Sequence, residues 1–396
     1  MSSISPPKYV RRILVTLEAR GHRAYLVGGC VRDMLLGVHP QDWDIATSAL
    51  PEEVTEIFPS SLPTGIRHGT VTVTADRRQV EVTTFRTDGA YADHRHPDRV
   101  SFVGDLTSDL SRRDFTMNAM ALAPDGRLMD PFGGAEDIDA RLIRCVGEPR
   151  LRFEEDALRM FRALRFASRL GFEIEGETLA AMAGCSGLAA KLAAERVRDE
   201  TEKILLSPRP ETVFTLIELG LMDRYLIRRA ARQERFRRVA ALPRRSLDRW
   251  AALCCLLLSE GAIASAESFL LSLRLDSRTL RCCVSCTAML QEPKPESRAQ
   301  WKRLLRRCGV DAVSCAARCR DALYGGGCFR ELKSILKSGE CFSMKHLAVN
   351  GDDLAALGFR GRELGDMLAF LLDYVIEFPG NNRRELLLSL AQGTEE

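Results

Sequence analysis

The hydrophobic pattern of this chain changes near residue 154, and this change limits the folds that the chain can adopt. Before it, short segments such as TVTVTA and QVEVTTF alternate apolar and polar residues, which predicts two strands joined as a hairpin by the polar turn at residues 76–78. After it, apolar residues recur at three- and four-residue spacing, as in ALRMFRALRFASRL, which predicts helices. The sequence therefore predicts a mixed α/β domain followed by an all-α region.

The length of 396 residues is too great for one hydrophobic core, because single cores stop growing at about 250–300 residues. Proline and glycine interrupt the helical pattern at residues 207–210, 291–295 and 325–327. These breaks predict four regions, which are an α/β head, a helical neck, a helical body and a helical tail at residues 1–140, 141–207, 208–295 and 296–396.

Composition excludes a membrane protein, because no run of about 18 uncharged apolar residues is present. The N-terminal sequence MSSISPPKYVRR lacks the apolar stretch of a secretory signal, so we expect a cytoplasmic protein. No obligatory protein partner is indicated. The thirteen cysteines are odd in number and widely spread, which favours reduced thiols over a disulfide framework.

Three of these cysteines, Cys282, Cys283 and Cys286, raise the question of a structural zinc site. Such sites normally use four soft ligands, and no second pair follows at zinc-finger spacing. Cysteines in a helical core are therefore the preferred interpretation.

Arginines are concentrated between residues 224 and 245, although the net charge of the chain is only +3. Such a run is typical of a surface that contacts a nucleic-acid backbone, and the alternative is a solvated helix face. The RNA contacts predicted from this run are Arg232, Arg235 and Arg238.

Paired glycines, Gly28 and Gly29, follow the apolar run AYLV and precede a helical pattern. Glycines between a strand and a helix let backbone amides approach a phosphate closely. The alternative is a tight turn with no ligand, and the glycines alone do not decide between the two.

Two carboxylates, Asp42 and Asp44, are spaced by two residues in the short strand-like segment DWDI. Residues two apart on a strand project to the same face, so these side chains should converge. Oxygen ligands suit Mg²⁺, and a pair of such ions about 3.5–4 Å apart activates a hydroxyl and stabilises a leaving pyrophosphate. Glu81, in the second strand of the hairpin, is a candidate third ligand, and a solvent-facing glutamate is the alternative.

The segment RRDFTMNA reads as a charged turn that enters a helix. Its arginines, Arg112 and Arg113, are suited to bidentate contacts with phosphates, and Asn118 to a sugar hydroxyl. Asp114 has the alternative role of holding these arginines in place.

Asp156 and Arg159 are three residues apart in EEDALRMFRALRF, so on a continuous helix their side chains are neighbours. A carboxylate accepts from an exocyclic amine and arginine donates to a ring nitrogen, which matches the Watson–Crick edges of C and A. G and U present the reverse pattern. The alternative is a helix-surface ion pair, worth only about 0.3–0.5 kcal/mol.

Five motifs occur in order within residues 24–170: LVGGCVRD, DWDIAT, VEVTTFR, RRDFTMNAMA and EEDALRMFRALRFA. On the basis of these motifs, the chain resembles the class II tRNA nucleotidyltransferase and bacterial poly(A) polymerase family. The resemblance implies a polymerase-β-like nucleotidyltransferase head that uses Mg²⁺. It also implies roles for particular side chains: metal binding by Asp42 and Asp44; triphosphate binding by Gly28, Gly29 and Arg32; nucleotide binding by Arg112, Asp114 and Asn118; base selection by Glu155, Asp156 and Arg159; and phosphate binding by Arg162.

The implied activity is template-independent addition of CCA to the 3′ end of tRNA from CTP and ATP. CC-only addition, A-only addition and poly(A) synthesis use the same kind of site and remain alternatives. Residues 87–97 look like the loop of relatives that add the terminal A, so we expect a deletion of residues 89–96 to preserve CC addition. The C-terminal sequence is similar to the tail of Gram-positive-type CCA-adding enzymes.

Overall fold

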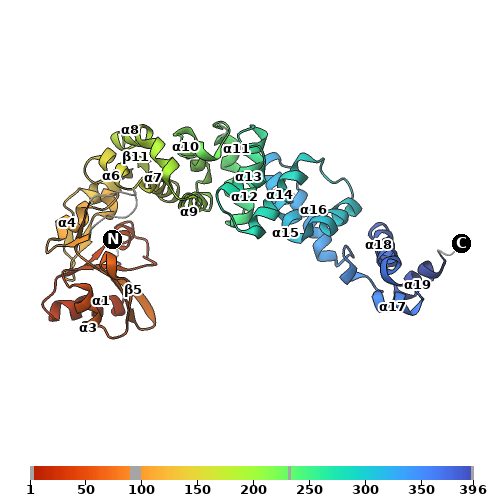
Figure 1. The fold of residues 1–396 in the computed structure, drawn as a ribbon, viewed down its shortest axis with the longest axis horizontal. Coiled ribbons are helices and arrows are strands. Elements are labelled where there is room, and N and C mark those ends of the chain that lie inside the picture. The colour runs from red at the N-terminus through yellow and green to blue at the C-terminus, as the bar shows by residue number, and fades with distance from the viewer. Residues whose placement is uncertain (1–3, 90–99, 231–232, 394–396) are drawn as a thin grey trace. The chain divides into compact units, whose positions relative to one another are not determined.

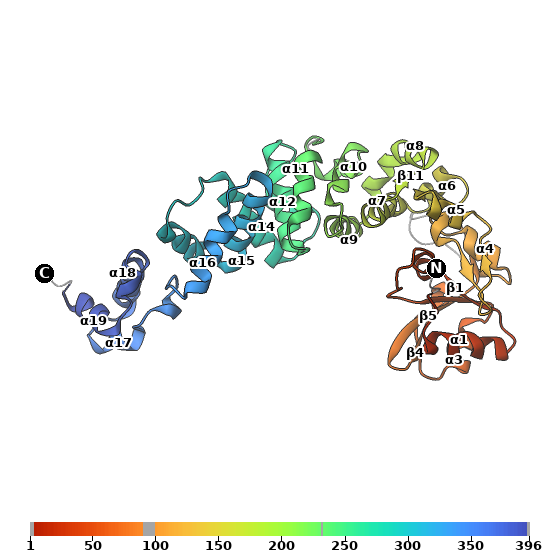
Figure 2. The ribbon, with the colours of Figure 1, turned by 180° about the vertical axis from the view of Figure 1, so that it is seen from behind.

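The chain forms two compact units. The computed structural model describes residues 4–89, 100–230 and 233–393. One unit comprises Met1–Ile204 and Thr212–Arg224, and the other comprises Leu205–Glu211 and Tyr225–Glu396. The large sheet lies in the N-terminal part of the first unit and helices make up most of the remainder (Figure 1, and from behind in Figure 2). The predicted fold class is confirmed, whereas the division into four regions stays a prediction.

The head is built on a seven-stranded mixed sheet with the order β3-β4-β5-β2-β1-β8-β9. Only β2 and β5 pair in parallel, and every other neighbouring pair in this sheet is antiparallel. The strands of the sheet are β1 Ala24–Val27, β2 Asp44–Thr47, β3 Ser61–Gly65, β4 Thr70–Ala75, β5 Arg78–Thr84, β8 Ala121–Leu122 and β9 Leu128–Met129. Two smaller pairs join β6 Arg86–Asp88 to β7 Val100–Phe102, and β10 Leu142–Ile143 to β11 Glu173–Ile174.

The predicted hairpin is confirmed as β4 and β5, which pair from Thr70 opposite Thr83 to Ala75 opposite Arg78. The turn is one residue shorter than expected, because Arg78 already belongs to β5. Asp76 and Arg77 both have positive φ, at 50° and 61°. Two consecutive left-handed residues are the geometry of a two-residue hairpin turn whose twist matches that of the strands.

Helices cover the sheet and continue from it in the first unit. Helices α1 and α3 contact β4, and α2 contacts β1. The helices of this unit are α1 Lys8–Ala19, α2 Gly29–Leu35, α3 Pro51–Ile57, α4 Leu106–Ser111, α5 Gly134–Asp139, α6 Pro149–Glu155, α7 Leu158–Leu170, α8 Gly176–Cys185, α9 Ala194–Leu205 and α10 Val213–Glu218. Leu106 and Leu110 of α4 are buried in a cluster with Val27, Ala46 and Phe85 from the sheet side.

The sequence expectation of one continuous helix through Asp156 and Arg159 is wrong. Helix α6 ends at Glu155, Asp156 has extended φ and ψ of −142° and 102°, and α7 begins at Leu158. The Asp156 carboxylate accepts a hydrogen bond from the Leu158 amide at 3.0 Å. This local side-chain bond satisfies a donor at the start of α7, which is why aspartate favours a helix boundary over a helix interior.

Nine α-helices are described in the second unit: α11 Gln233–Arg237, α12 Ser246–Ser259, α13 Ala266–Ser272, α14 Ser277–Gln291, α15 Arg298–Tyr324, α16 Cys328–Ser338, α17 Gly351–Ala356, α18 Gly361–Glu377 and α19 Arg384–Gln392. Helix α14 ends at Gln291 and α15 ends at Tyr324, at two of the predicted breaks. Gly309 kinks α15, with φ of 79°. None of the helices in the described ranges has both the length and the apolar character that crossing a bilayer requires.

Candidate active site

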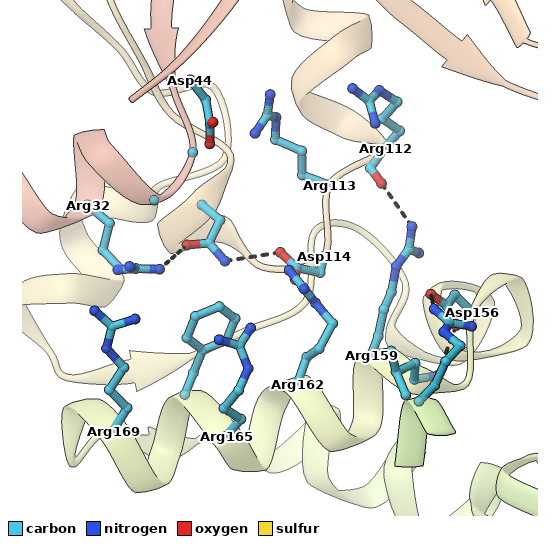
Figure 3. A pocket seen from close by; sticks show the side chains of 16 residues that line it. Arg32, Asp44, Arg112, Arg113, Asp114, Asp156, Arg159, Arg162, Arg165 and Arg169 are labelled. Carbon is cyan, nitrogen blue, oxygen red and sulfur yellow. Dashed lines mark hydrogen bonds and ion pairs between the residues drawn. The ribbon is translucent and has the colours of Figure 1, made fainter. Parts of the chain in front are cut away.

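A pocket of about 440 Å³ in the first unit collects most of the side chains that the sequence singles out (Figure 3). Eight arginines and three aspartates line it, so its charge favours an anionic ligand. The predicted residues that line the pocket are Gly28, Gly29, Arg32, Asp44, Arg112, Asp114, Asn118, Asp156, Arg159 and Arg162. Arg113, which the sequence also indicates as a phosphate contact, lines the pocket as well, and the remaining lining residues are Leu158, Arg165, Phe166, Arg169 and Arg196.

The turn between β1 and α2 favours glycine at position 28 because of its backbone conformation, and the space beside it is limited. Gly28 has φ of 74°, a left-handed conformation that side chains disfavour. A Cβ at this position would also lie 2.8 Å from Nη1 of Arg113 and 3.9 Å from Oδ2 of Asp44. The backbone of this turn therefore lies close to the side chains of Arg113 and Asp44 at the pocket wall.

The carboxylates of the head converge through the parallel pairing of β2 and β5, in which Asp44 is opposite Glu81. Asp44 is half-buried at the start of β2, and Asp42 is exposed just before it. Burial, together with the charges of Glu81 and Asp42, raises the pKa of Asp44 to about 6, against the lowering effect of Arg113. Crowded oxygen ligands of this kind fit a hard divalent cation, which would relieve their mutual repulsion.

A chain of hydrogen bonds joins the head to α7 across the pocket floor. Nη1 of Arg32 donates to Oδ1 of Asn118 at 2.7 Å, and Nδ2 of Asn118 donates to Oδ1 of Asp114 at 3.1 Å. Oδ2 of Asp114 accepts from Nε and Nη2 of Arg162 at 2.8 and 2.6 Å. Although burial raises it, the charge of Arg162 and the Asn118 hydrogen bond bring the pKa of Asp114 to about 2.

Asp114 therefore holds Arg162 rather than the arginines beside it in sequence. Those arginines pair instead with Asp109, whose carboxylate accepts from Nη2 of Arg112 at 2.8 Å and from Nη2 of Arg113 at 3.3 Å. The segment also differs from the predicted helix start, because Arg112 caps the end of α4 and residues 116–118 form a single 3₁₀ turn.

The ring of Phe166 serves as a platform for guanidinium groups. The guanidinium carbons of Arg165, Arg32 and Arg162 lie 4.3, 5.1 and 5.7 Å from its centroid. Cations over an aromatic face are attracted by its quadrupole. One side chain thus helps to hold three like charges in a single pocket.

Asp156 and Arg159 both line the pocket, but each is paired with another residue. Asp156 forms a bidentate ion pair with Arg196 of α9, at 3.0 and 3.3 Å. Arg159 contacts the Glu155 carboxylate and donates from Nη2 to the Arg112 carbonyl oxygen at 3.0 Å. The helix break at Asp156 and these two partners replace the simple side-by-side pair that the sequence predicts.

Three predicted site residues, Asp42, Glu81 and Glu155, are not among the lining residues of this pocket. Arg165 and Arg169 were missed, although their three- and four-residue spacing after Arg162 on α7 was a usable signal. Arg196 was also missed, and it carried no local signal because it comes from a separate helix.

The predicted RNA contacts lie in the second unit. Arg235 and Arg238 are exposed, while Phe236 and Val239 between and beside them are fully buried. The Arg235 guanidinium lies 5.8 Å from the centroid of the Tyr324 ring. Arg232, and residues 90–97 of the predicted loop, lie outside the described residues.

Comparison with known proteins places these features in a family. The model for the Poly A polymerase head domain matches residues 24–144. A model described as the probable RNA and SrmB-binding site of polymerase A matches residues 171–227, and tRNA nucleotidyltransferase domain 2 (putative) matches residues 243–391. The matched segments thus include the sheet, the part of the pocket that the head contributes, and most of the helical second unit, whereas the pocket residues between Asp156 and Arg169 lie between two matched segments.

The relatives match over nearly their whole length. The CCA-adding enzyme of Geobacillus sp. (strain WCH70) is 40% identical over 350 residues, covering 86% of this chain and 85% of the relative. That of Lactiplantibacillus plantarum is 37% identical over 385 residues, covering 96% and 94%. The crystal structure of Bacillus stearothermophilus CCA-adding enzyme in complex with CTP matches with a TM-score of 0.84 at 35% identity, covering 99% of this chain and 98% of that one. The chain therefore belongs to the CCA-adding enzyme family.

Proposed function

We propose that this protein adds C, C and A to the 3′ end of tRNA from CTP and ATP, without a template and with release of pyrophosphate. The observation that carries the proposal is the composition of one pocket, which combines a carboxylate from the sheet, eight arginines, and the Asp156 and Arg159 side chains. In Figure 3, Arg113, Asp114 and Arg162 lie between Asp44 and Asp156. We infer that the triphosphate lies towards Asp44 and the base towards Asp156.

The metal ligands in this proposal are Asp42, Asp44 and Glu81. They offer only oxygen, the donor that Mg²⁺ prefers. Burial and then the neighbouring charges of Glu81 and Asp42 raise the pKa of Asp44, and a bound cation would offset both effects. When bound there, Mg²⁺ would activate the RNA 3′ hydroxyl and stabilise the leaving pyrophosphate. The protein's own part is to hold the carboxylates together through the β2–β5 pairing.

The phosphate ligands in this proposal are Arg32 and Arg162, with Arg112 and the Gly28–Gly29 backbone. The hydrogen-bond chain through Asn118 and Asp114 fixes the two guanidinium groups before a nucleotide arrives. Guanidinium groups held in advance lose less conformational freedom when they bind a phosphate. Asp114 and Asn118 are thus positioning residues in this scheme.

Base selection is assigned to Asp156 and Arg159, with Glu155 as the partner that orients Arg159. A carboxylate has about four lone-pair sites, so Asp156 can accept from an exocyclic amine while it stays paired with Arg196. Arg159 supplies donors for a ring nitrogen. C and A offer this combination of amine and acceptor, and U and G do not.

Product sequencing tests the function directly. The substrates are tRNAs ending at the discriminator base, at C and at CC, each given CTP, ATP or a mixture. The expected products are CC with CTP alone, A on the tRNA ending in CC, and full CCA with the mixture. A product that stops at CC in the mixture, an enzyme that adds only A, or a run of A identifies one of the alternative activities.

Glu81→Gln tests the third metal ligand. Loss of one negative charge beside Asp44 should raise the Mg²⁺ concentration needed for half-maximal activity, because the site attracts the cation less strongly. The measurement is a Mg²⁺ titration of the transfer rate. Glu52→Gln, an exposed change in α3, is the control. An unchanged titration would make Glu81 a solvent-facing strand residue.

The arginine run should give tRNA affinity a steep salt dependence, because each neutralised phosphate releases a counterion. Replacing Arg235 and Arg238 by alanine should make the slope of log K against log salt less negative by about 1.5. Arg12→Ala, an exposed arginine of the head, is the control. If affinity and slope both stay unchanged, this run is a solvated face and RNA binds elsewhere.

We also propose that the reaction takes place in the cytoplasm. All thirteen cysteines are unpaired in the structure, which suits a reducing compartment. In this scheme the body and tail at residues 208–295 and 296–396 hold the tRNA, the neck at residues 141–207 carries the base-selecting residues, and the head at residues 1–140 carries the metal ligands.

A further inference from the structure

Seven of the thirteen cysteines are buried in the helices α12, α14 and α15, which contact one another pairwise. They are Cys254 and Cys255 of α12, Cys282, Cys283 and Cys286 of α14, and Cys315 and Cys319 of α15. Nothing in the proposed transfer reaction uses them. A helical core does not need this concentration of sulfur, since leucine and alanine fill such space without a reactive group.

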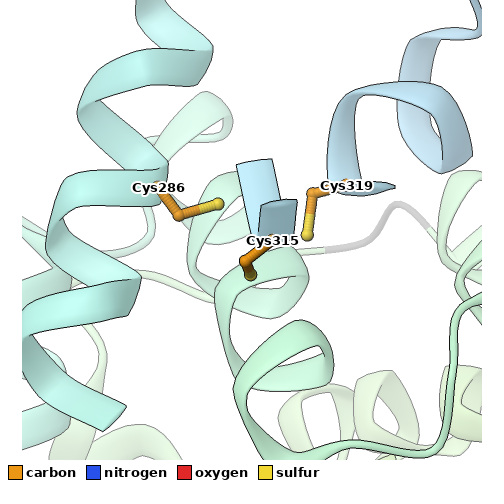
Figure 4. A group of neighbouring side chains, drawn as sticks. All are labelled: Cys286, Cys315 and Cys319. Carbon is orange, nitrogen blue, oxygen red and sulfur yellow. The ribbon is translucent and has the colours of Figure 1, made fainter. Parts of the chain in front are cut away.

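The thiols of Cys286, Cys315 and Cys319 form the centre of this group (Figure 4). Their three Sγ atoms all lie within 4.8 Å of one another, and all three side chains are fully buried. Four sulfurs around one tetrahedral Zn²⁺ at about 2.3 Å are about 3.8 Å apart. Shifts on the order of 1 Å would therefore bring these thiols to the spacing of a metal site.

A fourth thiol approaches from the remaining helix. Cys255 of α12 lies close enough to Cys286 and Cys319 to influence the electrostatics of both thiols. Three helices thus converge on one point, with one sulfur from α12, one from α14 and two from consecutive turns of α15. The sequence shows only the α14 cysteines as a cluster, because the other ligands come from helices distant along the chain.

The hydrogen bonds that these thiols make are compatible with their acting as thiolate ligands. The three thiols lie close enough to interact with one another, and all three are buried. The thiols of Cys315 and Cys319 also donate to the carbonyl oxygens of Leu247 and Asp248, at 3.7 and 3.4 Å. These carbonyl oxygens lie in the first turn of α12, where they also accept hydrogen bonds from backbone amides of the next turn. They therefore keep a hydrogen-bond partner when the thiols lose their protons.

We propose that Cys286, Cys315 and Cys319, with Cys255 as the fourth ligand, form a closed structural site for a single Zn²⁺ ion. Thiolate ligands select soft metals such as zinc over Mg²⁺. An iron–sulfur cluster is a poorer fit, because several iron atoms would have to separate sulfurs that lie this close together. The ion would tie α12, α14 and α15 together, and it requires no contact with the pocket of the first unit.

The test uses the full-length protein, purified without chelators or a polyhistidine tag after growth with added zinc. We expect about one zinc ion per chain. Cys286→Ala, Cys315→Ala and Cys319→Ala should each lose it. Cys283→Ala, an equally buried change in α14, and Cys145→Ala in the first unit should retain it. Zinc held by the carboxylates of the head would survive all five changes, and that result would overturn the proposal.

A second measurement does not depend on the folding of any variant. The wild-type protein is stripped of metal and titrated with Co²⁺ under anaerobic conditions. The expected spectrum has intense thiolate-to-cobalt charge-transfer bands together with the visible bands of tetrahedral Co²⁺, and Zn²⁺ should abolish both. A purified wild type without zinc that also gives no charge-transfer bands would show that these cysteines are only core residues.

Discussion

Replacing Asp44 with alanine is expected to lower the rate of nucleotide transfer to less than about 1% of wild type, a loss of at least about 2.7 kcal/mol of transition-state stabilisation. Asp44 is the carboxylate that the sheet places in the pocket, directly opposite Glu81 of β5. Its removal takes away the central anionic ligand for Mg²⁺. The affinity for tRNA should be retained, because in our proposal the helical regions hold the RNA. Asp42→Ala should act in the same direction.

Single-turnover transfer rates in Mg²⁺ and equilibrium binding of tRNA together check this prediction. Asp125→Ala is the matched control, because Asp125 is an exposed aspartate of the head paired with Arg127. A variant at Asp44 that folds normally and turns over at more than about 1% of the wild-type rate would remove Asp44 from the catalytic role. Equal losses of transfer and of tRNA binding would indicate damage to the fold instead.

Asp156→Asn is expected to reduce the preference for CTP over UTP by about ten- to a hundredfold, which is the effect of one charge-assisted hydrogen bond. The amide keeps the shape of the carboxylate and still accepts from the Leu158 amide, so the start of α7 should be preserved. It also adds a donor, which can serve O4 of U. The measurement is the ratio of kcat/KM for CTP to that for UTP on tRNA ending at its discriminator base.

Two further variants separate base reading from structural damage. Arg196→Ala removes the ion pair but leaves the Asp156 carboxylate, so it should change the nucleotide ratio less than Asp156→Asn does. Asp199→Asn, an exposed change on the same helix as Arg196, should leave the ratio unchanged. If Asp156→Asn lowers activity on both nucleotides equally, Asp156 serves the structure through Arg196 and does not read the base.

The elements of the fold that were predictable are those determined by local sequence. The hairpin β4–β5 follows from alternation and a polar turn, and the ends of α14 and α15 follow from proline and glycine. The boundary between α6 and α7 was not predicted, because the apolar spacing continues across Asp156 and conceals the break. The signal for this boundary is Asp156 itself, because an aspartate side chain can accept a hydrogen bond from a backbone amide in the first turn of the helix that follows.

The sequence predicted the residues of the candidate site that lie within a single motif. It did not predict which of these residues pair with each other. Asp114 pairs with Arg162 of α7, and Asp156 pairs with Arg196 of α9, in both cases across a large separation in sequence. Hydrophobic periodicity carries no information on which distant charges meet, because that depends on how the helices pack. For the same reason the sequence singles out Cys286 but does not connect it with Cys255, Cys315 and Cys319.

The parallel pairing of β2 and β5 makes the transfer site sensitive to strand register. Side chains alternate between the faces of a strand, so a slip of β5 by one residue would turn Glu81 away from Asp44 and present Val80 or Val82 in its place. The tight turn at Asp76 and Arg77 sets the alignment of β5 on β4. An insertion in that exposed turn would therefore behave as an active-site mutation, although it changes no residue of the pocket.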